Sequence, residues 1–309
     1  MWRRIHDDEA NTDEASARSL LRAEKPQWAA LAMSYLDSSG TDNAMWRLHR
    51  PDQSDLLLRL PRTEGAAHGL AIESEILPVL RDTYGLSVPN LCYIGTPTAD
   101  FPYVWAVLEW LPGSDAWAER DDLLHADGEA LARDLATEIS VLSTVKGLNV
   151  AVRAAGDRGG PLPALLDRLD AWLDDPVWNA ARYMNIDAIR RSAAQSREVA
   201  GQPAAASFLH GDLIPGNILV INRRLSALID WGGAGIGDPA QDFGPAWAIL
   251  NGTARRTFRE VLEIDEPTWL RARAFELEHA VGGVLYYTPK RHPLADVMAR
   301  TLERILDGT

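Results

Sequence analysis

Residues 210–232 combine side chains that could transfer a phosphoryl group to a hydroxyl. They include His210-Gly211-Asp212-Leu213-Ile214-Pro215-Gly216-Asn217, and Asp230-Trp231-Gly232 begins thirteen positions after Asn217. Such a transfer requires a carboxylate that accepts or orients the acceptor hydroxyl, and oxygen ligands that hold Mg²⁺ against nucleotide phosphates. Asp212 can supply that carboxylate, and the side chains of Asn217 and Asp230 can supply two metal ligands.

The chain between these residues predicts a hairpin that brings the two metal ligands together. Two apolar runs, 218–221 and 225–229, flank a polar turn. Asn217 and Asp230 lie at the outer ends of the two arms, so their oxygens can converge on one ion. The alternative for Asp212 and Asn217 alone is an ordinary turn, where both residue types are common. For His210 we expect a supporting hydrogen bond rather than acid–base chemistry.

The remaining segments indicate two parts of different composition. Residues up to 110 predict a strand-rich part with one long helix, and most later segments have the apolar spacing of helices. The segment Leu111-Pro112-Gly113-Ser114 is the best boundary, because proline and glycine interrupt regular structure. The expected strands are 28–36, 44–49, 55–61, 91–94 and 103–110, and the expected helices are 12–23, 66–81, 128–145, 162–173, 187–199, 267–287 and 293–306.

The charge of the chain excludes several classes of partner. Its 309 residues include 44 acidic and 31 basic side chains, which gives a net charge of −13. A duplex-binding protein needs a basic face, yet no run of Lys or Arg exceeds two residues, so nucleic acid and anionic membrane are poor partners. A cationic small molecule suits this charge better.

The sequence also favours a reducing cytoplasmic location. No segment approaches eighteen uninterrupted apolar residues, so we expect no transmembrane helix. The N-terminal stretch turns acidic after His6, which argues against a secretory signal. A single cysteine, Cys92, permits no internal disulfide, and we expect it to be a buried structural residue.

The complete pattern resembles the aminoglycoside and macrolide phosphotransferase family, small-molecule kinases with a protein-kinase-like fold. The matching residues are His210-Gly211-Asp212, Asn217, Ile229-Asp230-Trp231 and Gly237-Asp238-Pro239 with Asp242, and more weakly Gly40-Thr41-Asp42-Asn43, Leu58-Arg59-Leu60-Pro61-Arg62 and Leu108-Glu109-Trp110-Leu111-Pro112-Gly113. The resemblance implies a two-lobe α+β fold. Its N-lobe (1–110), an antiparallel sheet with one helix, would bind nucleotide; a hinge (111–114) would lead to a mainly helical C-lobe (115–309) with the catalytic hairpin and acceptor site.

The resemblance also implies roles for the motif residues. Asp212 would be the catalytic base, and Asn217 and Asp230 would bind Mg²⁺ with ATP or GTP held between the lobes as phosphate donor. Asp242 would brace the catalytic loop, with His210 as a second structural support.

The first lobe departs from the kinase pattern at the residue that binds phosphate. Kinases place a lysine on the third strand, but Arg59 stands there and none of the three lysines of this chain can replace it. Some members of the resembled family, macrolide kinases among them, also carry arginine there, and a guanidinium can bridge phosphate oxygens bidentately. The alternative is an exposed strand arginine. Glu73 is the predicted partner of Arg59, and Glu75, on another side of the helix, is the fallback.

Three further nucleotide contacts are expected. The Thr41 hydroxyl, with nearby backbone amides, could cover the phosphates, although a plain hairpin turn fits the same residues. By the resemblance, the Glu109 carbonyl and the Leu111 amide meet the purine edge. Since these are backbone contacts, they do not separate ATP from GTP.

The sequence gives few indications of which residues bind the acceptor. An ammonium or sugar hydroxyl could meet Glu276, Glu278 and His279 of one helix, or Asp174 and Asp175, although solvated helix faces explain the same residues. Aromatic side chains that could either line an apolar pocket or pack in the core are Trp247, Trp269, Tyr286 and Tyr287.

The sequence therefore predicts Mg²⁺-dependent transfer of a nucleotide γ-phosphate to a small-molecule hydroxyl. The first acceptor class is an aminoglycoside- or macrolide-type antibiotic, and the second is a metabolite such as an amino alcohol, a homoserine-like compound or a sugar. A catalytically silent nucleotide-binding protein is the alternative from another class, and Arg59 alone favours it. A metal-dependent hydrolase using His210 and Asp212 lacks the further ligands such sites need.

Overall fold

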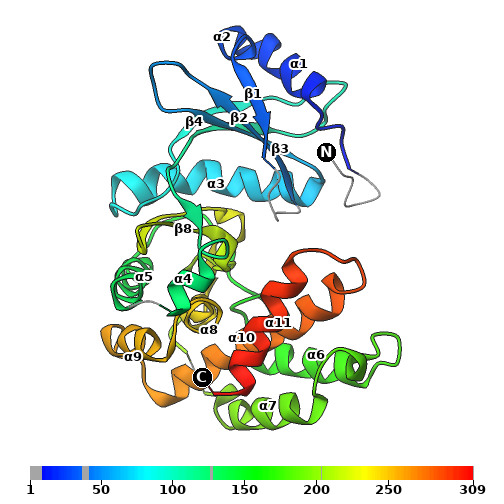
Figure 1. The fold of residues 1–309 in the computed structure, drawn as a ribbon, viewed down its shortest axis with the longest axis vertical. Helices are drawn as coiled ribbons and strands as arrows, with labels where there is room; N and C mark the ends of the chain where they lie inside the picture. The colour runs from blue at the N-terminus through cyan, green and yellow to red at the C-terminus, as the bar shows by residue number, and fades with distance from the viewer. Residues whose placement is uncertain (1–8, 37–41, 126–127, 203, 309) are drawn as a thin grey trace. The chain divides into compact units, whose positions relative to one another are not determined.

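The computed structural model describes residues 9–36, 42–125, 128–202 and 204–308. Their contacts divide the chain into two compact units: unit 1, Met1–Pro112 with Ser226–Gly233, and unit 2, Gly113–Leu225 with Ala234–Thr309. Unit 1 is built on an antiparallel sheet and unit 2 is mainly helical, as predicted (Figure 1). The lobe and hinge ranges 1–110, 111–114 and 115–309 stay predictions. Among the described residues, no helix combines the length and apolar character that a membrane span requires.

The sheet of unit 1 separates an apolar core from a face that carries a charge. Its strands follow the order β1-β2-β3-β5-β4. Neighbouring side chains on a strand point to opposite faces, so Leu56, Leu58 and Leu60 enter one buried cluster while Arg59 faces helix α3. The elements are Ala32–Tyr35 (β1), Asn43–His49 (β2), Leu56–Pro61 (β3), Leu91–Gly95 (β4), Trp105–Glu109 (β5), Glu14–Glu24 (α1), Pro26–Ala29 (α2) and Glu64–Asp82 (α3).

Helix α3 brings one acidic side chain to the sheet. Thr63 caps its N-terminus by accepting a hydrogen bond from the Ala66 amide. Buried positions then recur every three or four residues, as expected of a helix packed on one face. Glu73 is the charged member of this buried stripe. A buried carboxylate requires a partner, and the sheet supplies it.

Unit 2 surrounds one long helix. Helix α10 packs against α6, α7 and α11, and against the short 3₁₀ helix Pro239–Phe243 (Figure 1). The helices are Arg120–His125 (α4), Glu129–Leu142 (α5), Leu162–Asp174 (α6), Ile186–Ala200 (α7), Pro245–Ala248 (α8), Gly252–Val261 (α9), Glu266–Tyr287 (α10) and Leu294–Leu306 (α11). Short strands of unit 2 are Ser114–Asp115 (β6), Ser207–Leu209 (β7), Ile218–Ile221 (β8) and Gly235–Gly237 (β10), and Arg224–Leu228 (β9) continues from unit 2 into unit 1. Further 3₁₀ helices are Ala180–Arg182 and Pro215–Asn217 in unit 2 and Trp231–Gly233 in unit 1.

The predicted catalytic hairpin is present in the chain. Strands β8 and β9 are joined at Asn222 and Arg223, which both have positive φ angles. A tight turn with two positive φ angles matches the right-handed twist of the strands that it joins. The hairpin therefore carries Asn217 before its first strand and Asp230 after its second.

Several local predictions were wrong. The strand predicted over 28–36 is two elements, because Pro26 opens helix α2 and the strand starts only at Ala32. Helices α4, α8 and α9 were not predicted. Cys92 is exposed rather than buried, since it lies on β4 at the edge of the sheet.

Candidate active site

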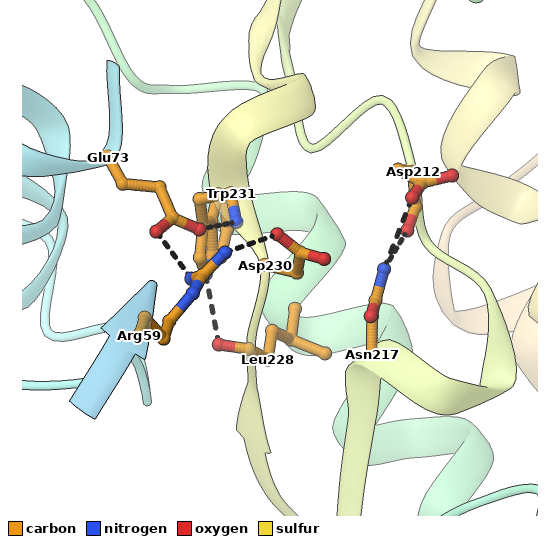
Figure 2. A network of polar contacts seen from close by, with 7 residues as sticks. All are labelled: Arg59, Glu73, Asp212, Asn217, Leu228, Asp230 and Trp231. Atoms are coloured by element: carbon orange, nitrogen blue, oxygen red, sulfur yellow. Dashed lines mark hydrogen bonds and ion pairs between the residues drawn. The ribbon is translucent and has the colours of Figure 1, made fainter. Parts of the chain in front are cut away.

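Arg59, Glu73 and Asp230 form one charged cluster within unit 1 (Figure 2). Arg59 Nη1 donates to Glu73 Oε2 at 2.6 Å, and Arg59 Nη2 donates to Asp230 Oδ1 at 3.0 Å. The Trp231 amide donates to the other oxygen of Glu73. The predicted pair is therefore formed with Glu73; the fallback, Glu75, is exposed on α3. The alternative of an exposed strand arginine is wrong.

The three side chains differ in how far they are buried, and this difference limits the role that each can have. The side chains of Arg59 and Glu73 are 9% and 1% exposed, whereas that of Asp230 is 42% exposed. Burial alone would lower the pKa of Arg59, but the Glu73 and Asp230 carboxylates raise that pKa above its ordinary value. Burial raises the pKa of Glu73, and Arg59 opposes the rise. Asp230 thus keeps an accessible oxygen beside a fixed positive charge.

Local backbone geometry fixes Asp230 to unit 1. Its φ angle is +66°, a left-handed conformation that short polar residues tolerate. The next residue, Trp231, is fully buried, and its indole N–H donates to the Leu228 carbonyl at 2.9 Å. A Cβ on Gly232 would lie 3.0 Å from Gly69 Cα of helix α3. The Asp-Trp-Gly segment therefore joins unit 1 through close packing on the helix that carries Glu73.

A buried aspartate braces the loop of Asp212 in unit 2. Asp242 accepts hydrogen bonds from the backbone amides of His210 at 2.6 Å and Gly211 at 2.9 Å. Burial raises the pKa of Asp242, and these hydrogen bonds act against the rise. Gly211 has a φ angle of +81°, which suits glycine. His210 is fully buried, and its Nδ1 accepts from the Asp212 amide at 3.3 Å.

Asp212 is held from two sides. Asn217 Nδ2 donates to the Asp212 carbonyl at 2.8 Å and to Asp212 Oδ2 at 3.4 Å (Figure 2). Arg158 Nη1 forms an ion pair with Asp212 Oδ1. Burial alone would raise the pKa of Asp212, but Arg158, His279 and His210 together outweigh burial and hold that pKa below its usual value. Asp212 is therefore set up to be ionised.

Each unit contains an oxygen atom of the type that a hard divalent cation prefers. In unit 2, the Asn217 amide turns its nitrogen toward Asp212, so its oxygen is the atom left for a metal. In unit 1, Asp230 offers an accessible carboxylate oxygen. The described residues contain no group of three or more His, Cys, Asp or Glu that could hold a metal ion.

The structure describes two of the three other residues predicted to contact the nucleotide, Glu109 and Leu111. Thr41 lies outside the described residues. Glu109 ends β5, where it pairs with Leu56, and its amide donates to the Asn90 carbonyl. Leu111 follows the strand. The contacts of Glu109 and Leu111 with a purine stay predictions.

A pocket of about 240 Å³ opens within unit 2 between α6, α10 and the loop of Arg158; we call it the α6–α10 pocket. Its lining combines two arginines, one carboxylate, a histidine and four aromatic side chains. The lining residues are Arg158, Arg168, Trp172, Trp178, Glu278, His279, Gly282, Gly283, Leu285, Tyr286 and Tyr287. One lining residue, Arg158, also pairs with Asp212, which is not itself part of the pocket lining.

The pocket sorts the acceptor candidates that the sequence left open. Glu278, His279, Tyr286 and Tyr287 line it, whereas the other candidates do not. Glu276 and Glu278 are 7% and 3% exposed, so the solvated helix face was a wrong interpretation for both. Trp247 is buried, which confirms core packing for that residue, and half-buried Trp269 stacks on it with ring centroids 4.5 Å apart.

Sequence reasoning missed Arg158, Arg168, Trp172 and Trp178. Arg158 stands in Gly156-Asp157-Arg158-Gly159-Gly160, and a charged residue between glycines was the available signal. The others belong to or follow an ordinary amphipathic helix, α6, and only tertiary packing places them at the pocket.

The fold is the two-lobe, kinase-like α+β fold of small-molecule phosphotransferases. A GDP and kanamycin complex of APH(2")-IIia superposes with a TM-score of 0.73 at 17% identity, covering 94% of this chain and 97% of that one. The apoenzyme of macrolide 2'-phosphotransferase MphH from Brachybacterium faecium superposes with a TM-score of 0.60 at 20% identity, covering 92% and 97%.

The chain belongs to the phosphotransferase enzyme family, whose model matches residues 36–275. A curated relative, "Uncharacterized protein YcbJ" of Bacillus subtilis (strain 168), is 24% identical over 208 residues. That match covers 60% of this chain and 60% of the relative's length. The predicted family resemblance is thereby confirmed.

Proposed function

We propose that this protein transfers the γ-phosphoryl group of Mg²⁺-bound ATP or GTP to a hydroxyl of a small molecule. The observation that carries the proposal is the placement of Asp212. Its loop is fastened by Asp242 through two backbone amides, and its carboxylate pairs with Arg158, which lines the α6–α10 pocket. A carboxylate held ionised beside a small-molecule pocket is suited to act as the base.

In the proposed reaction, the acceptor binds in the pocket with its hydroxyl at Asp212. The hydroxyl proton passes to an Asp212 oxygen while the hydroxyl oxygen forms a bond to the γ-phosphorus. The bond from that phosphorus to the β,γ-bridging oxygen breaks, and its electron pair leaves with the nucleoside diphosphate. Mg²⁺, with Asn217 and Asp230 as its protein ligands, would neutralise charge on the phosphates. This role requires the two side chains to share the ion.

Arg59 is the proposed phosphate ligand in place of a kinase lysine. Glu73 orients its guanidinium, and its buried Nε has no hydrogen-bond partner among the described residues. A buried donor without a partner costs free energy, and a phosphate oxygen would satisfy it. The intact pair with Glu73 argues against the catalytically silent alternative. Thr41, Glu109 and Leu111 complete the proposed nucleotide contacts.

The size of the pocket favours an acceptor of metabolite size. A volume of about 240 Å³ is smaller than the roughly 300–1,000 Å³ of sites for drug-sized ligands. Aminoglycoside or macrolide antibiotics are the second candidate class, suggested by the kanamycin and macrolide in the names of the similar structures. These two structures are 17% and 20% identical to this chain, so the similarity supports a shared fold only. Proteins of one fold can use different acceptors.

The test measures nucleoside diphosphate release with Mg-ATP and Mg-GTP against hydroxyl-bearing metabolites, kanamycin and a macrolide. Asp212→Ala should reduce acceptor-dependent release by about 10²–10⁴-fold while nucleotide binding by calorimetry is retained. Chelation of Mg²⁺ should also stop release. Unchanged turnover in Asp212→Ala would remove the base assignment. If the wild-type protein binds no Mg-nucleotide, the proposed function is wrong.

A further inference from the structure

We propose that Arg158 selects acceptors that carry an anionic group near the hydroxyl to be phosphorylated, and that it disfavours polycationic acceptors. This inference rests on the proposed function, in which Asp212 and the α6–α10 pocket receive the acceptor. It gives a positioning role to a residue outside the family motifs matched above.

Arg158 stands where acceptor and base must meet. It lines the α6–α10 pocket and pairs with Asp212 Oδ1. The side chains of Arg158 and Asp212 are 43% and 30% exposed, so neither group is closed off by the protein. A hydroxyl that approaches Asp212 therefore meets a guanidinium on the same carboxylate.

The loop that carries Arg158 is anchored on both sides of the residue. The Gly156 carbonyl accepts from Arg168 Nη1 at 2.6 Å, and the Gly159 amide donates to Gln241 Oε1 at 3.0 Å. Gly159 has a φ angle of +76°, and a Cβ there would lie 2.8 Å from the side chain of Leu209. The backbone around Arg158 is thus built into unit 2, and the guanidinium is not a freely moving surface group.

The charges around the pocket suit an anion better than several cations. Among the described lining residues, the positive side chains are Arg158 and Arg168, and the carboxylate is Glu278. Arg168 Nε donates to Glu278 at 2.7 Å, so that carboxylate is already neutralised. His279 Nδ1 lies 3.7 Å from the Glu276 carboxylate. An ammonium in this pocket would have to compete with Arg168 for Glu278 and with Arg158 for Asp212.

An acceptor anion would resolve the competition at Asp212. Bound to Arg158, it takes the place of Asp212 Oδ1 as guanidinium partner, and that oxygen becomes available to the acceptor hydroxyl. Guanidinium groups bind carboxylate and phosphate oxygens bidentately, so either anion is suitable. The aromatic side chains, Trp172 and Tyr286 among them, can cover the carbon skeleton.

The experiment compares acceptors that carry an anionic group with counterparts that lack it. The pairs are 3-phenyllactate with its amide, 4-hydroxybutanoate with its amide, and glycerol 3-phosphate with glycerol; kanamycin is the polycation. Calorimetric affinity and nucleoside diphosphate release are measured with wild-type protein, Arg158→Gln, Arg158→Lys and Arg190→Gln. Arg190 is the matched control, since it is a surface arginine paired with Asp174 away from the pocket.

For the wild-type protein, at least one acid or phosphate should bind about tenfold or more tightly than its neutral partner. Arg158→Gln should remove that preference, Arg158→Lys should retain part of it, and Arg190→Gln should leave it unchanged. A preference within either acid–amide pair would show that the site accepts a carboxylate. A preference within the glycerol pair would show that it accepts a phosphate. Equal affinities within every pair, no binding of any anion, or tightest binding of kanamycin would overturn the inference.

The two proposals fail differently. Phosphorylation of neutral or cationic acceptors with no effect of Arg158→Gln would leave the proposed function standing and remove the role of Arg158. Arg158-dependent binding of anions without phosphoryl transfer to any acceptor that binds would contradict the proposed function and leave an anion site.

Discussion

Arg59 of β3 and Glu73 of α3 lie fourteen residues apart in sequence and 2.6 Å apart in space, and both side chains are almost fully buried. The strand alternation turns Arg59 away from the leucine core, and the helical stripe turns Glu73 toward the sheet. The pair therefore fixes the relation between strand and helix as well as the guanidinium that we propose to bind phosphate.

Replacing Glu73 should destabilise the protein more than an exposed glutamate on the same helix. Glu73→Gln leaves the buried Arg59 charge with Asp230 alone, and loss of one partner of a buried ion pair costs about 3–5 kcal/mol. The free energy of unfolding from urea titration should fall accordingly, and affinity for Mg-nucleotide should fall with it. Glu75→Gln is the matched control and should change neither. Equal stability of the two variants would contradict the structural role of the pair.

Asp242 should matter for turnover because it positions the loop of Asp212. In Asp242→Asn, one of the two backbone amides of His210 and Gly211 faces an amide nitrogen instead of an oxygen. An unsatisfied buried donor costs about 1–3 kcal/mol, so we expect lower stability and a reduced kcat with little change in the KM for nucleotide. Steady-state kinetics and urea titration measure both; a kcat equal to that of the wild type would contradict the bracing role.

Gly232 should not tolerate a side chain. A Cβ there would meet the backbone of Gly69 at 3.0–3.4 Å, and neither backbone can yield without moving the segment that carries Asp230. Gly232→Ala should lower the free energy of unfolding by about 1–3 kcal/mol and weaken nucleotide binding. Gly65→Ala, where the added Cβ meets only the Thr63 hydroxyl at 3.9 Å, is the control. If both variants have wild-type thermal transitions, this packing is not limiting.

Glu24 should make stability depend on pH in the acidic range. Burial acts to raise the pKa of Glu24, but hydrogen bonds from Thr96 and Tyr93 outweigh it and lower that pKa below its ordinary value of 4.5. Because the folded state holds the proton less tightly than the unfolded state, this contribution is present above about pH 4.5 and is lost as the pH falls through the lowered pKa. Glu24→Gln should be less stable than wild type at pH 7, and the difference should narrow toward pH 3. A difference that stays constant over this range would exclude the linkage.

The sequence by itself determined the motif that we propose to be catalytic, the hairpin and most of the elements. His210, Asp212, Asn217 and Asp230 are close along the chain, and local patterns of apolar residues and turns decide short-range structure. The local prediction failed at α2 because Pro26 begins a short helix, whereas the sequence pattern predicts a strand that starts soon after it. The phosphotransferase family followed from the same short segments.

Tertiary structure decided which distant residues meet. Asp242 reaches the His210 loop across thirty-two positions, and Arg158 reaches Asp212 across fifty-four. The α6–α10 pocket likewise joins residues more than a hundred positions apart, such as Arg168 and Glu278. A helical pattern specifies which face is apolar, but it does not specify which other helix covers that face. The pocket and its charges therefore became visible only once the packing of α10 was known.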